Sequence, residues 1–170
     1  MTTPLIPTAS GLSFPAAIAS VFKKYATFSG RATRSEYWWW MLFHYLVQIA
    51  LSVFMLIGMV ISAASAIGNS NWTQPDNDMW VPQGSADPVG MGFFFFGLVL
   101  LALWALATII PTLAVTVRRL HDAGYTGWLI LLELIPFGAV VVFIFTVLPS
   151  QQVNNKWGAA PLRAGAAAAA

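Results

Sequence analysis

The sequence from Tyr37 to Ile67 reads YWWWMLFHYLVQIALSVFMLIGMVISAASAI and contains no Lys, Arg, Asp or Glu. A membrane-spanning α-helix needs about 20 consecutive apolar residues, so this stretch is long enough to cross a bilayer. Its first four residues are aromatic, and amphipathic rings of this kind lie in the headgroup layer. We therefore predict a membrane helix whose first turn marks one membrane boundary.

Two further apolar runs follow. The run from Val89 to Val117 has no charged residue and predicts a second span. The run from Trp128 to Leu148 is also long enough but carries Glu133 and Pro136, and we predict a third span there. An alternative stays open, because a break at Pro136-Phe137-Gly138 would make this run a re-entrant hairpin. Three spans place the tail outside the cell, whereas the hairpin places it inside.

The composition excludes a soluble globular protein. Of 170 residues, 58% are hydrophobic, 14% aromatic and only 8% charged, whereas soluble domains have about 25% charged residues. The chain has no cysteine and two histidines, too few ligands for an ordinary zinc site. No phosphate-binding loop and no catalytic triad is recognisable in the sequence. We therefore expect no metal, no cofactor, no nucleic acid and no enzymatic activity.

Six basic residues lie before the first predicted span or between the second and the third: Lys23, Lys24, Arg31, Arg34, Arg118 and Arg119. Such segments lie on the cytoplasmic side of a membrane, so we expect a multi-pass inner-membrane protein with a cytoplasmic N-terminus. From Ser13 onward, Phe14, Ile18 and Val21 recur at helical spacing beside the lysines, which indicates an interfacial amphipathic helix.

The predicted fold class is an all-α membrane protein with three transmembrane helices and an N-terminal interfacial helix. The expected segments are a mobile leader (1–12), the interfacial helix and a polar string (13–36), three spans (about 37–67, 91–117 and 128–148) with an outer loop (68–90), and a polar, Ala-rich tail (149–170).

Four polar residues are expected inside the membrane: His44, Gln48, Thr112 and Glu133. Of these, His44, Thr112 and Glu133 are expected at similar depth, and Gln48 lies on the same helix face as His44. A charge at the centre of a membrane helix costs about 2.5 to 3.5 kcal/mol on insertion scales, so Glu133 needs a partner or a proton. His44 and the nearby arginines are candidate partners. The four groups form either a satisfied helix interface or a path for protons or solutes.

A second group is expected at the cytoplasmic membrane face: Arg31, Arg34, Glu36, Arg118, Arg119, His121, Asp122 and Trp128. Opposite charges in this group can hold the helices together. The excess of arginine can instead bind an anionic lipid headgroup or an acidic partner, because guanidinium matches phosphate and carboxylate in a forked geometry.

Five strings carry a resemblance to a known family: Phe28 to Trp38, Arg118 to Asp122, Gly127-Trp128, Ile135-Pro136, and Asn155 to Gly158 with Pro161. Together they resemble the YhaH-like small bacterial inner-membrane proteins, the domain of unknown function 805. Lys156 and Trp157 stand where that family usually has Arg and Tyr, and the loop around Trp72 to Pro88 is longer than usual. The resemblance implies a helical inner-membrane protein and carries no established activity.

The sequence therefore favours a non-catalytic accessory or scaffold subunit of a respiratory, photosynthetic or envelope complex. Its expected partners are anionic membrane lipids, other membrane subunits, or further copies of the chain. The alternative is a small transporter or channel that uses His44, Gln48 and Glu133.

Overall fold

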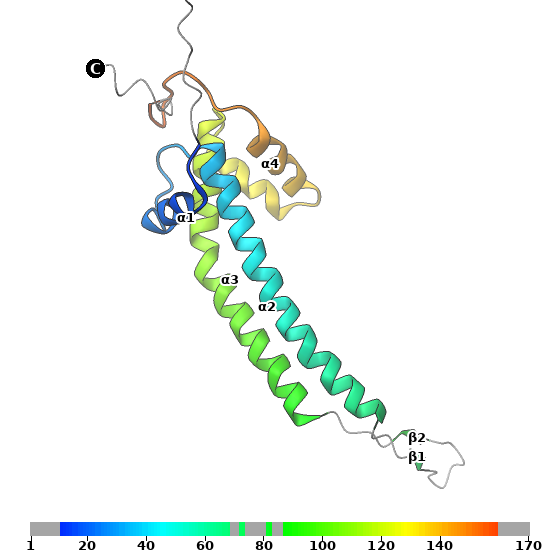
Figure 1. The fold of residues 1–170 in the computed structure, drawn as a ribbon. Helices are drawn as coiled ribbons and strands as arrows, with labels where there is room; N and C mark the ends of the chain where they lie inside the picture. Colours follow the sequence, from blue (N-terminus) through cyan, green and yellow to red (C-terminus); the bar gives the residue numbers. More distant parts are fainter. Residues whose placement is uncertain (1–10, 69–71, 74–80, 83–86, 160–170) are drawn as a thin grey trace, which may run out of the picture. The chain divides into compact units, whose positions relative to one another are not determined.

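The computed structural model describes residues 11–68, 72–73, 81–82 and 87–159, so most of the predicted leader and the end of the tail lie outside the described residues. The elements in chain order are helices α1 (Phe14–Lys23) and α2 (Arg34–Gly68), strands β1 (Trp72–Thr73) and β2 (Val81–Pro82), helix α3 (Pro88–Asp122), the 3₁₀ helix η1 (Gly127–Leu134) and helix α4 (Gly138–Val147) (Figure 1). The two strands pair antiparallel. The predicted helical class is confirmed.

Two of the described helices, α2 and α3, are long and apolar enough to cross a membrane. Each has 35 residues, with a mean hydropathy of 2.3 for α2 and 2.6 for α3 in its most apolar window. At 1.5 Å per residue each is about 52 Å long, well beyond the roughly 30 Å hydrocarbon layer. Both extend past the predicted span boundaries, and Arg118 and Arg119 lie within the last turns of α3.

The third span, predicted from Trp128 to Leu148, is not confirmed. This run forms η1 and α4, two short helices that contact each other. At about 2.0 Å per residue in η1 and 1.5 Å in α4, each is about 15 Å long and reaches half of the hydrocarbon layer. The structure instead has the helix break that the hairpin alternative requires.

The break has a local cause in Ile135-Pro136-Phe137. Pro136 has no amide hydrogen and disfavours helix at the residue before it, and Ile135 is accordingly extended at φ −109° and ψ 150°. Phe137 then takes a left-handed conformation, with φ 65°. A Cβ added to Gly138 would lie 1.6 Å from the Leu132 carbonyl oxygen, so only glycine permits this close return.

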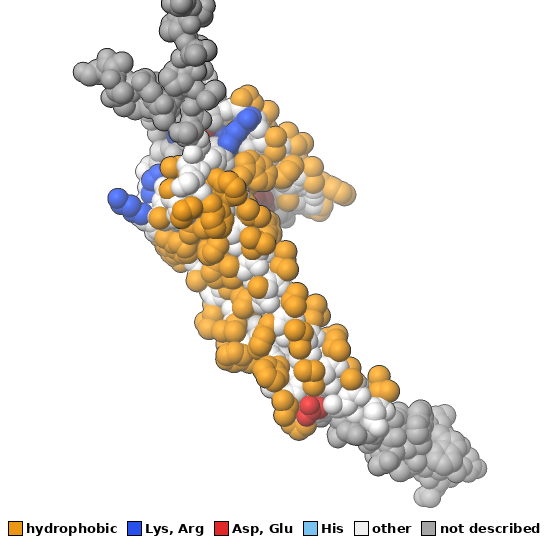
Figure 2. Space-filling view, viewed as in Figure 1, with side chains coloured by type: hydrophobic (Ala, Val, Ile, Leu, Met, Phe, Trp, Pro, Cys, Tyr) orange, Lys and Arg blue, Asp and Glu red, His pale blue; other side chains and the backbone are white. Residues whose placement is uncertain are grey.

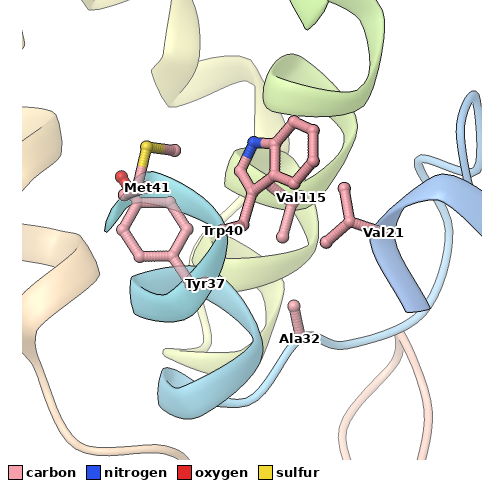
Figure 3. Packing of buried hydrophobic residues seen from close by; sticks show 6 residues of the cluster. All are labelled: Val21, Ala32, Tyr37, Trp40, Met41 and Val115. Carbon is pink, nitrogen blue, oxygen red and sulfur yellow. The ribbon is translucent and has the colours of Figure 1, made fainter. Parts of the chain in front are cut away.

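The described chain divides into two compact units, residues 1–44 with 108–170, and residues 45–107. The first unit has a hydrophobic core of six buried residues, shown in Figure 3: Val21, Ala32, Tyr37, Trp40, Met41 and Val115. Trp40 is fully buried, and its indole Nε1 donates a 3.1 Å hydrogen bond to the Thr112 hydroxyl. The core therefore joins α1, the start of α2 and the end of α3.

Helix α1 confirms the predicted amphipathic helix. Pro15 lies in its first turn, where a missing amide hydrogen costs nothing. Ala17 and Val21 are fully buried, and the Phe22 ring packs edge-on against Trp40 at 5.2 Å. The opposite face is exposed and includes Lys23. Burial of one face by the first unit fixes the helix in place.

Glycines determine how α2 and α3 approach in the second unit. A Cβ on Gly58 would lie 2.6 Å from the Phe94 amide nitrogen, and one on Gly90 would lie 2.6 Å from the Ser62 amide nitrogen. Backbones this close leave no room for any side chain at the two positions. Small residues permit such contacts between membrane helices, where close packing drives association.

Candidate functional site

The segment before α2 places Arg31, the first arginine of the group predicted at the cytoplasmic face. Gly30 has φ +88°, a conformation that favours glycine, and its carbonyl oxygen lies 3.3 Å from His121 Nδ1. The buried Ala32 then donates its amide hydrogen to the Arg118 carbonyl oxygen at 3.0 Å. These contacts fix the segment to the end of α3 and direct Arg31 toward Asp122.

Asp122 is shared by two arginines, one on each carboxylate oxygen. Arg31 Nε lies 2.9 Å from Oδ1, and Arg119 Nη1 lies 2.5 Å from Oδ2. The side chains are 4% exposed for Arg31 and 0% exposed for Arg119 and Asp122. A buried charge is tolerated when it is paired and hydrogen-bonded, and this carboxylate has both forms of compensation.

Three arginines also donate to backbone carbonyls at and after the end of α4. Arg34 binds the carbonyls of Val147 at 2.8 Å and Leu148 at 3.2 Å. Arg119 binds that of Thr146 at 2.9 Å and also that of Leu148. The last four carbonyls of an α-helix lack partners within the helix and carry the negative end of its dipole, so cationic donors are favoured there.

Arg31 extends the same pattern into the tail. Its guanidinium donates to the carbonyl oxygen of Val153 at 2.9 Å and to that of Gln151. We call Arg31, Arg34 and Arg119 the carbonyl-binding arginines. Together they attach both the end of α4 and the following tail to the end of α2 and α3 that lies in the first unit.

The tail forms further contacts with the end of α3. The Gln151 amide donates to the Asp122 carbonyl at 2.9 Å, and the Asn155 side chain donates to the His121 carbonyl at 3.0 Å. The Trp157 ring stacks on the His121 imidazole at 4.6 Å, with Lys156 Nζ 4.4 Å from the indole centroid. The prediction of site residues did not include Gln151, Asn155 or Trp157, although the string Asn155 to Gly158 had already contributed to the family resemblance.

Glu36 is the centre of a second charged group. Its Oε1 accepts from Arg118 Nη1 at 2.8 Å and from the Ser20 hydroxyl at 3.1 Å, and it lies 3.6 Å from Lys24 Nζ. Glu36 is in the first turn of α2, where a negative charge is favoured by the helix dipole. The group therefore joins α1, α2 and α3 through one carboxylate oxygen.

The predicted cytoplasmic group thus comes together except for Trp128. The structure brings Arg31, Arg34, Glu36, Arg118, Arg119, His121 and Asp122 into the first unit as connected hydrogen-bond and ion-pair networks. Trp128 is 76% exposed on η1. Its ring is therefore available to the membrane or to a partner rather than to these charges.

In the first unit, the structure brings together two of the residues predicted inside the membrane, His44 and Thr112, but not Glu133. Thr112 accepts from Trp40, and His44 stacks on the Trp40 indole at 6.4 Å. Within the described part of the chain, the exposed Glu133 makes no hydrogen bond or ion pair with His44 or any other residue. Gln48 belongs to the second unit and is half-buried.

Two long apolar helices, with the charged residues gathered at helix ends, define a helical membrane protein. The chain belongs to the family described as "Protein of unknown function (DUF805)", which matches residues 25–159. The matched range contains every residue of the two charged networks except Ser20 and Lys24.

Two curated relatives come from Escherichia coli (strain K12). The chain is 29% identical over 143 residues to "Inner membrane protein YhaI", covering 84% of this chain and 92% of that protein. It is 27% identical over 143 residues to "Inner membrane protein YhaH", covering 83% of this chain and 92% of that protein. No solved structure matches the chain. The comparisons support an inner-membrane protein.

Proposed function

We propose that this protein is a non-catalytic accessory or scaffold subunit of a larger inner-membrane assembly. The observation that carries this proposal is the apolar surface left uncovered within the chain. Only 11% of the most apolar window of each long helix is buried, and Figure 2 shows hydrophobic side chains over much of the visible described surface. Exposed apolar surface of this extent is available to lipid tails and to the helices of other membrane proteins.

The use of the charged residues supports a structural role. Arg31, Arg34 and Arg119 each bind carbonyl groups of α4 or the tail, and Asp122 compensates two of their charges. These groups hold the fold together at one end of the long helices. Internal ion pairing and the binding of an acidic partner would use the same guanidinium groups. Contacts within the chain already occupy most of their N–H donors.

We further propose two membrane crossings, a re-entrant hairpin formed by η1 and α4, and a cytoplasmic location for both the N-terminal segment and the tail. The carbonyl-binding arginines connect the end of α4 to the first residues of α2 and the last turns of α3. The start of η1 follows the end of α3 after a short connection, so both ends of the hairpin lie at the same ends of the spanning helices. The basic residues at those ends favour the cytoplasmic side.

Single cysteines test this topology without background, because the chain has none. Lys23→Cys, Asp87→Cys and Val153→Cys are compared in spheroplasts and in inverted vesicles with a membrane-impermeant maleimide. We expect Asp87→Cys to react in spheroplasts and the other two to react only in inverted vesicles. Reaction of Val153→Cys in spheroplasts would support the three-span topology instead. A membrane-permeant maleimide is the control that identifies thiols buried in the protein.

The subunit role is tested by extraction of the tagged full chain from its native membranes. In mild detergent we expect a stoichiometric assembly with other membrane proteins, identified by native mass spectrometry, and in harsh detergent its dissociation. A lone stable oligomer in mild detergent would contradict the role. The topology experiment is independent of this outcome.

One observation favours the second candidate function, a small transporter or channel. Glu133 is an exposed carboxylate on an apolar hairpin and has no partner among the described residues. In proteoliposomes, a proton path through Glu133 requires that Glu133→Gln lower the proton flux and that His44→Ala do the same. Unchanged flux in both variants would remove this candidate.

A further inference from the structure

Arg118 is a buried charge with part of its hydrogen-bonding capacity unused. Its side chain is 1% exposed, and Nη1 donates to Glu36 at 2.8 Å. Within the described residues, Nε and Nη2 are buried and have no acceptor. A buried donor without an acceptor destabilises the folded state, and the cost is larger when the group is charged. Two such donors on one guanidinium indicate that an acceptor from outside the described chain completes this site.

The local charges define what kind of acceptor fits. Arg118 and Lys24 both lie against Glu36 Oε1, at 2.8 Å and 3.6 Å, so two cations share one carboxylate. The first turn of α2 adds the positive end of a helix dipole. The group therefore has one positive charge in excess, and an anion with several acceptor oxygens compensates it best.

Lys24 is the member of this group that reaches solvent. Its side chain is 43% exposed, whereas those of Glu36 and Arg118 are 3% and 1% exposed. Three exposed aromatic residues, Phe22, Tyr25 and Phe28, lie on the same stretch of chain as Lys24. Exposed aromatic rings beside lysine are typical of the headgroup layer of a membrane.

We propose that Arg118 and Lys24 bind a phosphate group beside Glu36. The phosphate belongs either to an anionic phospholipid headgroup or to a soluble phosphate ion, and the exposed aromatic residues favour the lipid. Guanidinium and ammonium groups both bind phosphate through charge-assisted hydrogen bonds. The proposal goes beyond the subunit role, and rests on the proposed topology only in placing this site at the membrane edge.

Native mass spectrometry of the full chain in mild detergent tests the lipid source. The probes are phosphatidylglycerol and phosphatidylethanolamine, which are anionic and zwitterionic. We expect selective retention of one phosphatidylglycerol per chain, and a loss of about five- to tenfold in its affinity with Lys24→Gln, since a basic residue near a membrane surface contributes about 1 kcal/mol. Lys23→Gln is the matched control, because Lys23 is adjacent and exposed and forms no ion pair within the described residues.

Arg118→Lys provides a second variant that keeps the positive charge but removes the planar guanidinium. We expect it to lower phosphatidylglycerol retention while thermal unfolding confirms that the chain stays folded. If the variant does not fold, the comparison of Lys24→Gln with Lys23→Gln still decides the proposal, since both positions are exposed. Loss of retention in Lys24→Gln alone supports the site.

Inorganic phosphate separates the two sources. At matched ionic strength, phosphate is compared with chloride for its effect on the thermal stability of the wild-type chain. The site is assigned to a soluble anion if phosphate stabilises the chain, if Lys24→Gln abolishes this effect, and if neither lipid is retained selectively. Selective phosphatidylglycerol retention assigns it to the headgroup. Equal retention of both lipids together with no effect of phosphate overturns the proposal, as does an equal effect of Lys23→Gln and Lys24→Gln. Neither result depends on whether the protein joins a larger assembly.

Discussion

Arg119→Gln should release the hairpin from the two long helices. Arg119 is completely buried and binds the Asp122 carboxylate and the carbonyls of Thr146 and Leu148. Loss of one partner from a buried ion pair costs about 3 to 5 kcal/mol. Asp122 keeps its contact with Arg31 at 2.9 Å, so we expect the lower end, about 3 kcal/mol. Since 1.4 kcal/mol is a factor of ten, the population with a detached α4 should rise roughly 100-fold.

A reporter cysteine at Val142 measures this opening. Val142 is 2% exposed on α4, and the chain has no other cysteine, so reaction with a small permeant maleimide reports transient exposure. We expect the labelling rate of Val142→Cys to rise by about two orders of magnitude in the Arg119→Gln background. Phe143→Cys, at a position that is already 54% exposed, should label at an unchanged rate.

The reasoning would be refuted if Arg119→Gln changed the labelling rate of Val142→Cys by less than about threefold while the double variant stayed folded and monodisperse. A threefold change corresponds to less than about 1 kcal/mol. Should Arg119→Gln fail to fold, Arg34→Gln tests the same contacts more mildly. Arg34 is exposed and binds only carbonyls, so we expect about 1 kcal/mol and a fivefold rise. Lys23→Gln controls for the loss of a positive charge.

Three further substitutions are expected to destabilise the protein, each measured by thermal unfolding in detergent. Gly90→Val should cost at least about 1 to 3 kcal/mol because its side chain meets backbone atoms, whereas Gly92→Ala, where a Cβ meets nothing within 4 Å, should be close to neutral; equal effects would contradict the close-packing interpretation. Trp40→Phe should cost about 1 kcal/mol or more through the lost bond to Thr112, and an unchanged midpoint would count against that bond. Asp122→Asn leaves two guanidinium groups without their buried carboxylate and should lower the free energy of unfolding by about 3 to 5 kcal/mol. A smaller loss of stability than that of Trp40→Phe would contradict this expectation.

The spans and the location of charge could be predicted because they depend on composition along the chain. Tyr37 to Ile67 and Val89 to Val117 lie within the two long helices, and the amphipathic pattern after Ser13 forms α1. The strings around Arg31 and Arg118 meet in one unit because they occupy the adjoining ends of α2 and α3. Periodicity and charge patterning are sufficient for these features.

The attachment of the tail could not be predicted in the same way. Arg31 and Arg34 bind main-chain carbonyls, which every residue has, so their acceptors at Val147 and Val153 have no signature in side-chain chemistry. Within the described residues, the ion pairs of these arginines and their neighbours involve Asp122 and Glu36 alone. Pairing opposite charges in the sequence therefore could not identify most of the hydrogen bonds that hold α4.

The placement of Glu133 depended on the helix type. The prediction counted its depth along an α-helix, which turns by about 100° per residue, whereas η1 is a 3₁₀ helix with three residues per turn, or about 120°. Over the six residues from Gly127 to Glu133 the difference accumulates to about 120°. The side chain of Glu133 therefore points in a different direction from the one an α-helix would give it, one residue before η1 ends at Leu134.

The carbonyl-binding arginines also constrain how the protein is synthesised. Arg34 and Arg31 bind carbonyls that follow them by 113 and 122 residues. At about 5 to 20 residues per second, translation leaves both arginines without these acceptors for roughly 6 to 25 s. On the topology proposed above, they stay at the membrane surface while α2 and α3 enter the bilayer, and water and lipid phosphates solvate them there. The pair of helices η1 and α4 is consequently the last part of the first unit to reach its native position. On the topology proposed above, an interruption of synthesis before Thr146 yields two inserted helices whose charged ends lack these acceptors.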